Sequence, residues 1–378
     1  MRDPDLGGVA LLGAFWLAVV AAAAAGLVSL SLVDQVVLLG VAVVLPLAIG
    51  GPAGWWAAAA AAATGAFLAP RGWAALLVVP FAATAGAVLA ARLRAAGDPR
   101  RWGLGDLAAV VAPGYALVAA GALAQSRGGV EALGLREPIV ELTAVHYTFG
   151  GAAALALAAR TLGEAKAGRA AVALTAAAPP VVAAGFVTGA APPQVGGAVL
   201  MTLGVWTTAT LHVRRAVVGR RDRGPAVLLA VSGLAVWLPM VLAVAWACGQ
   251  HWRVPALSVP DMARTHGLAN ALAFTLCGLV GRAARAPGAG IRCAREQEST
   301  RRTPPWRWSA TSTAYRTVLR MIRSISYRPW RRIATPIASG ISENENTTRV
   351  CAAASHLGVS LLPDPLNDGT IDSSMMIR

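Results

Sequence analysis

The sequence predicts an all-α fold, a polytopic bundle of about ten transmembrane helices followed by a basic, largely disordered C-terminal tail. Three observations support this prediction. Apolar stretches of membrane-spanning length recur between residues 7 and 281. The arginines between them fall mostly in every second gap, a sorting that a soluble protein does not need. After about residue 285 the alanine content falls and no further apolar stretch appears.

A hydrocarbon core about 30 Å thick requires about 20 apolar residues of helix to cross it. The stretches are rich in Ala, Leu and Val without the polar–apolar alternation of barrel strands, so each is expected to be a helix. In chain order the spans are expected at 7–31, 35–50, 52–69, 72–91, 104–124, 138–159, 170–190, 194–213, 225–247 and 262–281. The second and third are short, so one re-entrant or kinked pair in their place is an alternative.

The basic residues in the gaps predict the orientation of the bundle. The gaps after the fourth, sixth and eighth spans contain most of them: Arg92, Arg94, Arg100, Arg101, Arg160, Lys166, Arg169, Arg214, Arg215, Arg220, Arg221 and Arg223. Positively charged short loops stay in the cytoplasm. We therefore expect both termini to be cytoplasmic and the protein to lie in the inner (plasma) membrane. The first apolar run is too long for a cleaved signal peptide and is read as an uncleaved span.

Composition narrows the classes of function. The net charge of +15 resembles that of a nucleic-acid binder, but its place in loops and tail indicates the lipid bilayer as the partner, and no nucleic acid is expected. The single lysine, Lys166, is flanked by alanines, so the chain has no P-loop. No HExxH, GxSxG or CxxC motif occurs. We expect no metal, no cofactor and no catalytic residue.

The sequence divides into a transmembrane helical domain at 1–285 and a basic cytoplasmic tail at 286–378. Between Ser299 and Ser342 the tail has nine arginines and no acidic residue. The residues Tyr315, Val318, Leu319 and Ile322 fall at helical spacing, which suits an interfacial helix on anionic lipid headgroups. Two alternatives remain: the tail is mostly disordered, or it is read-through of an altered frame.

Polar and ionisable residues inside membrane helices are costly and therefore point to function. Two clusters stand out, at 141–151 in the sixth span and at 262–270 at the start of the tenth. The candidates for a substrate or proton path are His146, His266, Asn270, Glu141, Thr143 and Arg264. A rise of about 1.5 Å per residue places both histidines in the outer half of the bundle.

Helical periodicity places some of these side chains together. Thr143 and His146 share a face, as do His266 and Asn270, and the glycines Gly150 and Gly267 would let a neighbouring helix or a ligand approach the histidines. Glu141 lies on another face and is expected to pair with Arg264, which lies at a similar depth. The alternative is that these groups only hydrogen-bond each other and lock the helices together. Two histidines without a third ligand do not predict a metal site.

The same two clusters resemble a known family. The stretch Leu142-Thr143-Ala144-Val145-His146-Tyr147 is similar to a segment of YndJ-like bacterial membrane proteins that reads roughly L-T-A-V-H-F-H-Y-A-G. A second signature, roughly T-H-G-x-x-N-A-L-G-F, resembles Thr265-His266-Gly267 with Asn270-Ala271-Leu272 and Phe274. The resemblance covers residues 1 to about 285 and implies a multi-pass membrane protein that is often described as a transporter. The family's second histidine aligns with Thr148 here, which places a role for that histidine in doubt.

Three functions of different classes are consistent with these features. The first is a gradient-driven secondary transporter of a small molecule or an ion, with the histidines in its path. Prolines at matching places of two five-span halves (Pro46 with Pro179 and Pro180, Pro80 with Pro239) suit an inverted repeat of such a transporter. The second is a membrane-embedded redox or enzyme subunit with metal or haem on the histidines. The third is a non-catalytic scaffold or sensor. We expect a transporter in preference to an enzyme.

Overall fold

The computed structural model describes residues 6–164, 166–218 and 223–284 of the chain. Contacts divide the chain into two units, Met1–Ile322 and Arg323–Arg378, and every described residue belongs to the first. Within the described ranges the regular structure is helical, apart from one isolated antiparallel bridge between Ala132 and Leu135. The all-α prediction is confirmed for these residues. The predicted tail at 286–378, with its interfacial helix, lies outside them.

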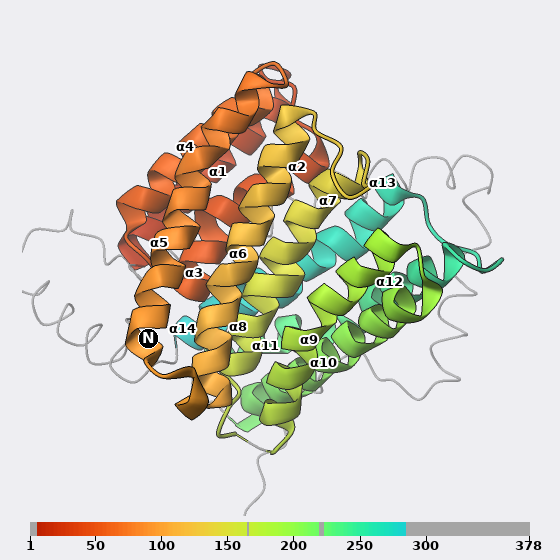
Figure 1. Cartoon of the computed structure of the whole chain (residues 1–378). Coiled ribbons are helices and arrows are strands. Elements are labelled where there is room, and N and C mark those ends of the chain that lie inside the picture. The colour runs from red at the N-terminus through yellow and green to blue at the C-terminus, as the bar shows by residue number, and fades with distance from the viewer. Residues whose placement is uncertain (1–5, 165, 219–222, 285–378) are drawn as a thin grey trace, which may run out of the picture. The chain divides into compact units, whose positions relative to one another are not determined.

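The helices follow one another along the chain as Figure 1 shows, and several join without a loop. The first group consists of α1 (Leu6–Ala24), α2 (Leu32–Leu39), η1 (Gly40–Val44), α3 (Leu45–Ile49), α4 (Ala53–Leu68), η2 (Trp73–Val78), α5 (Val79–Ala96), η3 (Pro99–Arg101) and α6 (Leu104–Gly128). The second group consists of α7 (Ile139–His146), η4 (Tyr147–Ala153), α8 (Ala154–Ala159), α9 (Lys166–Thr188), α10 (Ala191–Val218), α11 (Arg223–Leu234), α12 (Trp237–Gly249), α13 (Val259–Met262), η5 (Ala263–Gly267), η6 (Ala269–Leu276) and α14 (Cys277–Ala283).

Seven helices among the described residues are long and apolar enough to cross a membrane: Leu6–Ala24, Leu32–Ile49, Trp73–Ala96, Leu104–Gly128, Ile139–Ala159, Lys166–Thr188 and Arg223–Gly249. Each overlaps a predicted span, which identifies a helical membrane protein. The predicted count of ten remains a prediction. Of the other three segments, α4 is apolar but has only 16 residues, and α10 and 259–283 are not among the helices that meet the requirement. The first helix ends at Ala24 rather than at residue 31, and Gly26 turns the chain with a φ of 74°.

Successive spans run in opposite directions, so the connections collect at two ends of the helical unit. The connections at 97–103 and 160–164, which belong to two of the basic gaps, lie at the same end, toward the bottom of Figure 1, which we call the basic end. The connection at 129–138 lies toward the top and that at 250–258 at the right, both away from the basic end. The charge sorting seen in the sequence therefore corresponds to a spatial sorting. That the basic end faces the cytoplasm remains a prediction from the charge rule.

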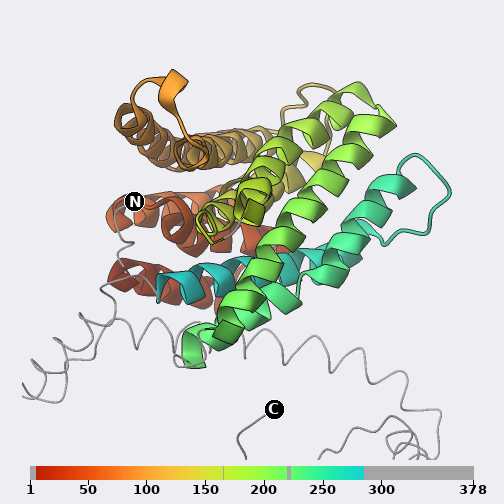
Figure 2. The same cartoon turned by 90° about the horizontal axis from the view of Figure 1, so that it is seen from below.

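The helix Leu32–Ile49 lies inside the unit. In its membrane-length window 83% of the residues are buried, against 22% for Leu6–Ala24, so α1 is peripheral and α2–α3 are central. Figure 2 shows the early helices (red to orange) and α9–α12 (green) on opposite sides, with the last helical segment reaching across both groups. The last segment contacts both sides, because α14 packs on α11 and on α3.

Helices α9 and α10 pack more closely than ordinary side chains would allow. A Cβ atom added at Gly185 would lie 2.3 Å from the backbone nitrogen of Gln194, and one at Gly197 would lie 2.5 Å from Val182 Cγ2. A Cβ atom at Gly204 would lie 2.6 Å from the Thr175 hydroxyl oxygen. Small residues at such an interface let membrane helices approach closely, since packing drives their association. These three glycines therefore allow the two helices of this hairpin to pack closely.

Wide π-helical turns interrupt several of the spans, which the sequence predicted to be α-helical throughout. They occupy η1, η4, η5 and η6, the last three around the two polar clusters. His146 directly precedes η4, and His266 lies within η5. π-Helical turns are rare in proteins as a whole, but those that occur are often found at functional sites. Their position therefore singles out the same two segments that the polar residues do.

Candidate functional site

A cavity of about 600 Å³ lies between the helices near the end opposite the basic end. Its walls come from α2, α6, α7, η4, α8, α9, α10, α12, α13, η5 and η6. Leu133 and Leu135 of the connection 129–138 also line it, whereas the connections at 97–103 and 160–164 contribute no lining residue. We call this space the histidine cavity. A cavity of this size is in the range of small-molecule sites in proteins.

Both predicted histidines line this one cavity. The Nδ1 atom of His146 lies 2.7 Å from the carbonyl oxygen of Leu142, and that of His266 lies 2.7 Å from the carbonyl oxygen of Pro239. Because a carbonyl oxygen only accepts, each Nδ1 must hold a proton and donate it. In the neutral ring the Nε2 atom is then a bare acceptor, and neither Nε2 has a hydrogen-bond partner among the described residues.

Asn270 and Thr143 lie in the same cavity wall, one turn from the histidines. The Asn270 side-chain amide donates to the carbonyl oxygen of His266 over 2.8 Å, and the Thr143 hydroxyl donates to that of Ile139 over 2.8 Å. The Thr143 hydroxyl proton and one N–H of Asn270 are thus used within their own helices. The amide nitrogen of Asn270 also lies 3.3 Å from Nδ1 of His266. These residues offer to the cavity the acceptor capacity of their oxygens, and Asn270 retains a second N–H.

The two glycines of the motifs also line the cavity. A Cβ atom at Gly267 would meet only the carbonyl oxygen of Met262, at 3.7 Å, and one at Gly150 would meet Met201 Cε at 3.8 Å. These are ordinary contact distances, so no neighbouring helix fills the space beside them. The glycines leave room next to both histidines, as the sequence predicted.

The predicted ion pair between Glu141 and Arg264 is wrong. Glu141 lies 4.0 Å from Arg127, and both side chains are largely buried. Arg264 instead pairs with Asp261 over 3.3 Å, where both are exposed. Neither Glu141 nor Arg264 lines the cavity. The prediction rested only on the similar depth of the two residues in the bundle. Depth does not determine the direction in which a side chain points around the axis of its helix.

Thr148, which stands where the resembling family has a second histidine, is buried and does not line the cavity. It packs against η1, where a Cβ atom added at Gly40 would lie 2.6 Å from Thr148 Cγ2. An imidazole at this position would need space that the central helix occupies. In this chain the position is therefore a packing position.

Two glutamines in the cavity wall escaped the sequence analysis. Gln194 is buried, and its Oε1 atom lies 2.8 Å from Nε2 of His251. Gln125 has a buried side-chain nitrogen without a hydrogen-bond partner among the described residues. An isolated glutamine near the end of a span gives only a weak signal, because many such residues simply reach the membrane interface.

Three arginines form a cluster at the basic end. Arg160 donates to the carbonyl oxygens of Leu47 and Ala48 over 2.8 and 3.2 Å, and Arg92 donates to that of Ile49 over 2.9 Å. These carbonyls end α3, where a helix leaves its last acceptors unpaired and its dipole negative. The third arginine, Arg282 of α14, donates to the carbonyl oxygen of Arg160 over 3.2 Å and pairs with Glu164. The sequence treated Arg92 and Arg160 only as orienting charges, yet they join α3, α5, α8 and α14.

A buried polar link crosses the middle of the second helix group. The Ser232 hydroxyl donates to the carbonyl oxygen of Phe274 over 2.7 Å, so it accepts from His212, whose Nδ1 lies 2.9 Å away. His212 is fully buried, and its Nε2 has no partner among the described residues. Phe274 belongs to the π-helical segment η6. The bonds of His212 and Ser232 connect α10, α11 and η6.

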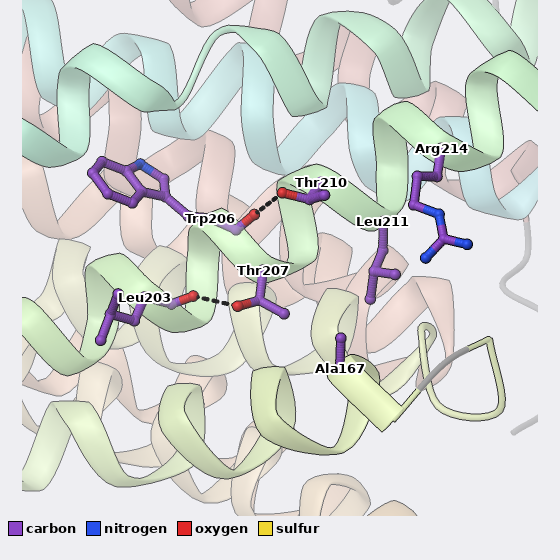
Figure 3. A pocket seen from close by; sticks show the side chains of 7 residues that line it. All are labelled: Ala167, Leu203, Trp206, Thr207, Thr210, Leu211 and Arg214. Carbon is purple, nitrogen blue, oxygen red and sulfur yellow. Dashed lines mark hydrogen bonds between the residues drawn. The ribbon is translucent and has the colours of Figure 1, made fainter.

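A second, smaller pocket of about 320 Å³ lies on α10, with Ala167 of α9 at one edge. Figure 3 shows Trp206 and Arg214 at its two ends, with Thr207 and Thr210 between them. The hydroxyls of both threonines bond to carbonyl oxygens four residues earlier, at 2.7 and 2.9 Å. None of the predicted site residues lines this pocket.

Metal-ligating side chains do not gather in the part of the chain that the structure describes. No group of three or more His, Cys, Asp or Glu residues lies together there. The described cysteines, Cys248 and Cys277, are both free thiols. The cavity thus provides two imidazole nitrogens, which are fewer protein ligands than a typical zinc site has.

No curated protein and no solved structure matches this chain. One family model does, and its description is YndJ-like protein. The match spans residues 35–274, so it includes both histidine motifs and most of the central helix and of the histidine cavity. It leaves out α14 with Arg282 and the region of the predicted tail. Because the match covers more than half of the chain, this protein belongs to the YndJ-like family.

Proposed function

We propose that this protein is a gradient-driven secondary transporter whose substrate site is the histidine cavity. The observation that supports the proposal is that His146, His266 and Asn270 line one cavity inside a bundle of membrane-length helices. Irregular helix segments around a site within the membrane are typical of transporters. The two histidines are next to π-helical turns of this kind.

The source of energy follows from the sequence and the site together. The chain contains no P-loop, so transport would be driven by a gradient or by another subunit. Each imidazole has an Nε2 atom without a hydrogen-bond partner among the described residues. A bare imidazole nitrogen can accept a proton and release it again. Proton coupling through His146 or His266 is therefore the coupling that this site suits best.

In any one state, a transporter exposes its substrate site to one side of the membrane only. The two ends of this bundle are unlike in a way that suits such a state. Residues of the connection 129–138 line the cavity. At the basic end, the bonds of Arg92, Arg160 and Arg282 join four helices. A path from the cavity to that side requires these bonds to break. The arrangement suits alternating access, in which one site opens to either side in turn.

The proposal is tested by the accessibility of the cavity from both sides of the membrane, which needs no knowledge of the substrate. A single cysteine replaces Thr143 in a chain whose own cysteines are changed to alanine. A membrane-impermeant maleimide is then applied to right-side-out and to inside-out vesicles. A transporter is expected to become labelled from both sides, with a rate that depends on the membrane potential or the pH gradient.

Two further single cysteines calibrate the measurement. Leu133→Cys lies in the connection 129–138, and Arg94→Cys lies near the basic end, so each is expected to react from one side only. If Thr143→Cys reacts only from the side that labels Leu133→Cys, under every gradient, the cavity has one opening. That result would refute transport and leave a receptor or scaffold.

A second candidate function is a haem-binding redox subunit. The observation that favours it is that both histidines are fixed by carbonyl groups through Nδ1, which leaves Nε2 as a ligand atom. A visible absorbance band in the purified protein that disappears in His146→Phe and in His266→Phe would support this function in place of transport. Absence of such a band from protein produced with excess haem would exclude haem as the occupant.

A further inference from the structure

The histidine cavity has an uncharged wall. Among the described residues that line it, none is Asp, Glu, Lys or Arg. Its ionisable side chains are His146, His266 and Tyr147. An ionised ligand inside it would lose its hydration without gaining a counter-charge, and burying an unpaired charge is very costly. The wall therefore favours a ligand with no net charge.

Most of the wall is also apolar. Helices α9, α10 and α12 contribute aliphatic and aromatic side chains, among them Val182, Phe186, Met201, Met240 and Trp246. Methionine adapts its shape to different apolar surfaces more readily than branched side chains do. Contact with this wall removes apolar ligand surface from water, which stabilises the complex by about 25 cal/mol per Å². The larger part of a fitting ligand is therefore hydrocarbon.

The polar groups of the wall that lack partners define the other end of the ligand. His146 and His266 each present an unpartnered Nε2 acceptor to the cavity, whereas the unpartnered side-chain nitrogen of Gln125 is buried in the wall. A hydroxyl or an N–H group can donate to an imidazole nitrogen. An ether or a ketone lacks the proton that the imidazoles require.

From these properties we infer that the histidine cavity binds a neutral amphiphile, a mostly hydrocarbon molecule with hydroxyl or N–H groups that donate to the Nε2 atoms of the histidines, one proton for each bond. The inference rests on the proposed function in one respect only, since it names this amphiphile as the transported molecule. Binding of the amphiphile is measured separately from transport, so either can fail alone.

The test uses four photoreactive probes with the same twelve-carbon chain and a diazirine at the same carbon. They are a primary alcohol, its methyl ether, the carboxylate and the ammonium analogue. The full chain is reconstituted in nanodiscs at a pH at which both charged probes are ionised, irradiated, digested and mapped by mass spectrometry. The alcohol is expected to label peptides of the cavity wall about tenfold more than each of the others, which corresponds to about 1.4 kcal/mol.

Two glycine variants separate the cavity from the lipid-facing surface. Gly267→Leu adds a side chain to the open space beside His266 and is expected to abolish cavity labelling. Gly86→Leu adds the same side chain on α5, where a Cβ atom meets nothing within 4 Å and outside the wall of the histidine cavity, so labelling should persist. The wild-type comparison of the four probes stands even if a variant fails to fold.

Several results would overturn the inference. Equal cavity labelling by the alcohol and its methyl ether would show that a donor is not required. Stronger labelling by either charged probe would show that the uncharged wall does not select against ions. Alcohol binding with one-sided labelling of Thr143→Cys would retain the inference and reject transport, whereas two-sided labelling without alcohol binding would do the reverse.

Discussion

The substitution Gly197→Ala tests whether the α9–α10 hairpin depends on the closeness of its helices. The added Cβ atom would lie 2.5 Å from Val182 Cγ2 and 2.6 Å from the backbone nitrogen of Val182. A side chain can rotate away, but the backbone nitrogen can only move if the helices separate. Overpacking of this kind costs about 1–3 kcal/mol. A cost of about 2 kcal/mol lowers the folded-to-unfolded ratio roughly thirtyfold.

The neighbouring glycine provides a matched control. A Cβ atom at Gly196 meets nothing within 4 Å, and both substitutions bring the same gain in helix propensity, up to about 1 kcal/mol. The difference between Gly197→Ala and Gly196→Ala therefore isolates the steric cost. Unfolding is followed by circular dichroism as sodium dodecyl sulfate is titrated into dodecylmaltoside micelles. Equal free energies of unfolding for the two variants would refute the reasoning about close packing.

Three further substitutions test individual contacts by the same unfolding measurement. Ser232→Ala removes the hydroxyl between two buried groups and should lower the free energy of unfolding by about 1–3 kcal/mol; an unchanged value would show that the link is not formed. Glu164→Gln leaves the largely buried Arg282 without its counter-charge and should cost about 3 kcal/mol; Arg282→Met in the same chain should restore most of that loss, and no restoration would argue against the pair. Thr148→His places an imidazole against Gly40 and should cost at least about 1–3 kcal/mol, whereas a fully stable variant would show that the position tolerates the family's histidine.

Helix positions could be predicted from sequence because apolar length is a direct physical requirement of the membrane. The placement of the basic connections at one end of the bundle could be predicted equally well, since successive spans reverse direction. The helix ends were less accessible: α1 stops at Ala24 because the chain turns at Gly26, and nothing in the apolar pattern marks that turn. The π-helical turns could not be predicted either. Their hydrogen bonds are made within one helix, but the composition of that helix does not mark where a wide turn replaces an α-helical one.

The candidate site was predictable as far as single helices determine it. Helical periodicity correctly grouped Thr143 with His146 and His266 with Asn270, and all four line one cavity. The pairing of Glu141 failed because it required knowledge of how two helices are rotated relative to each other. The arginine cluster was missed for the same reason, since Arg160 bonds to carbonyl oxygens more than a hundred residues away.

The central claim is that His146 and His266 present two Nε2 lone pairs to one occupant. It is tested most directly by nitrogen-15 NMR of histidine-labelled protein in nanodiscs, with signals assigned through His146→Asn and His266→Asn. We expect both rings in the neutral form with the proton on Nδ1, as their carbonyl partners require. Addition of dodecane-1,2-diol, whose two hydroxyl groups supply one proton for each ring, should shift both Nε2 signals together. A shift of only one signal, or of neither, or a proton found on Nε2 in the ligand-free protein, would contradict the account.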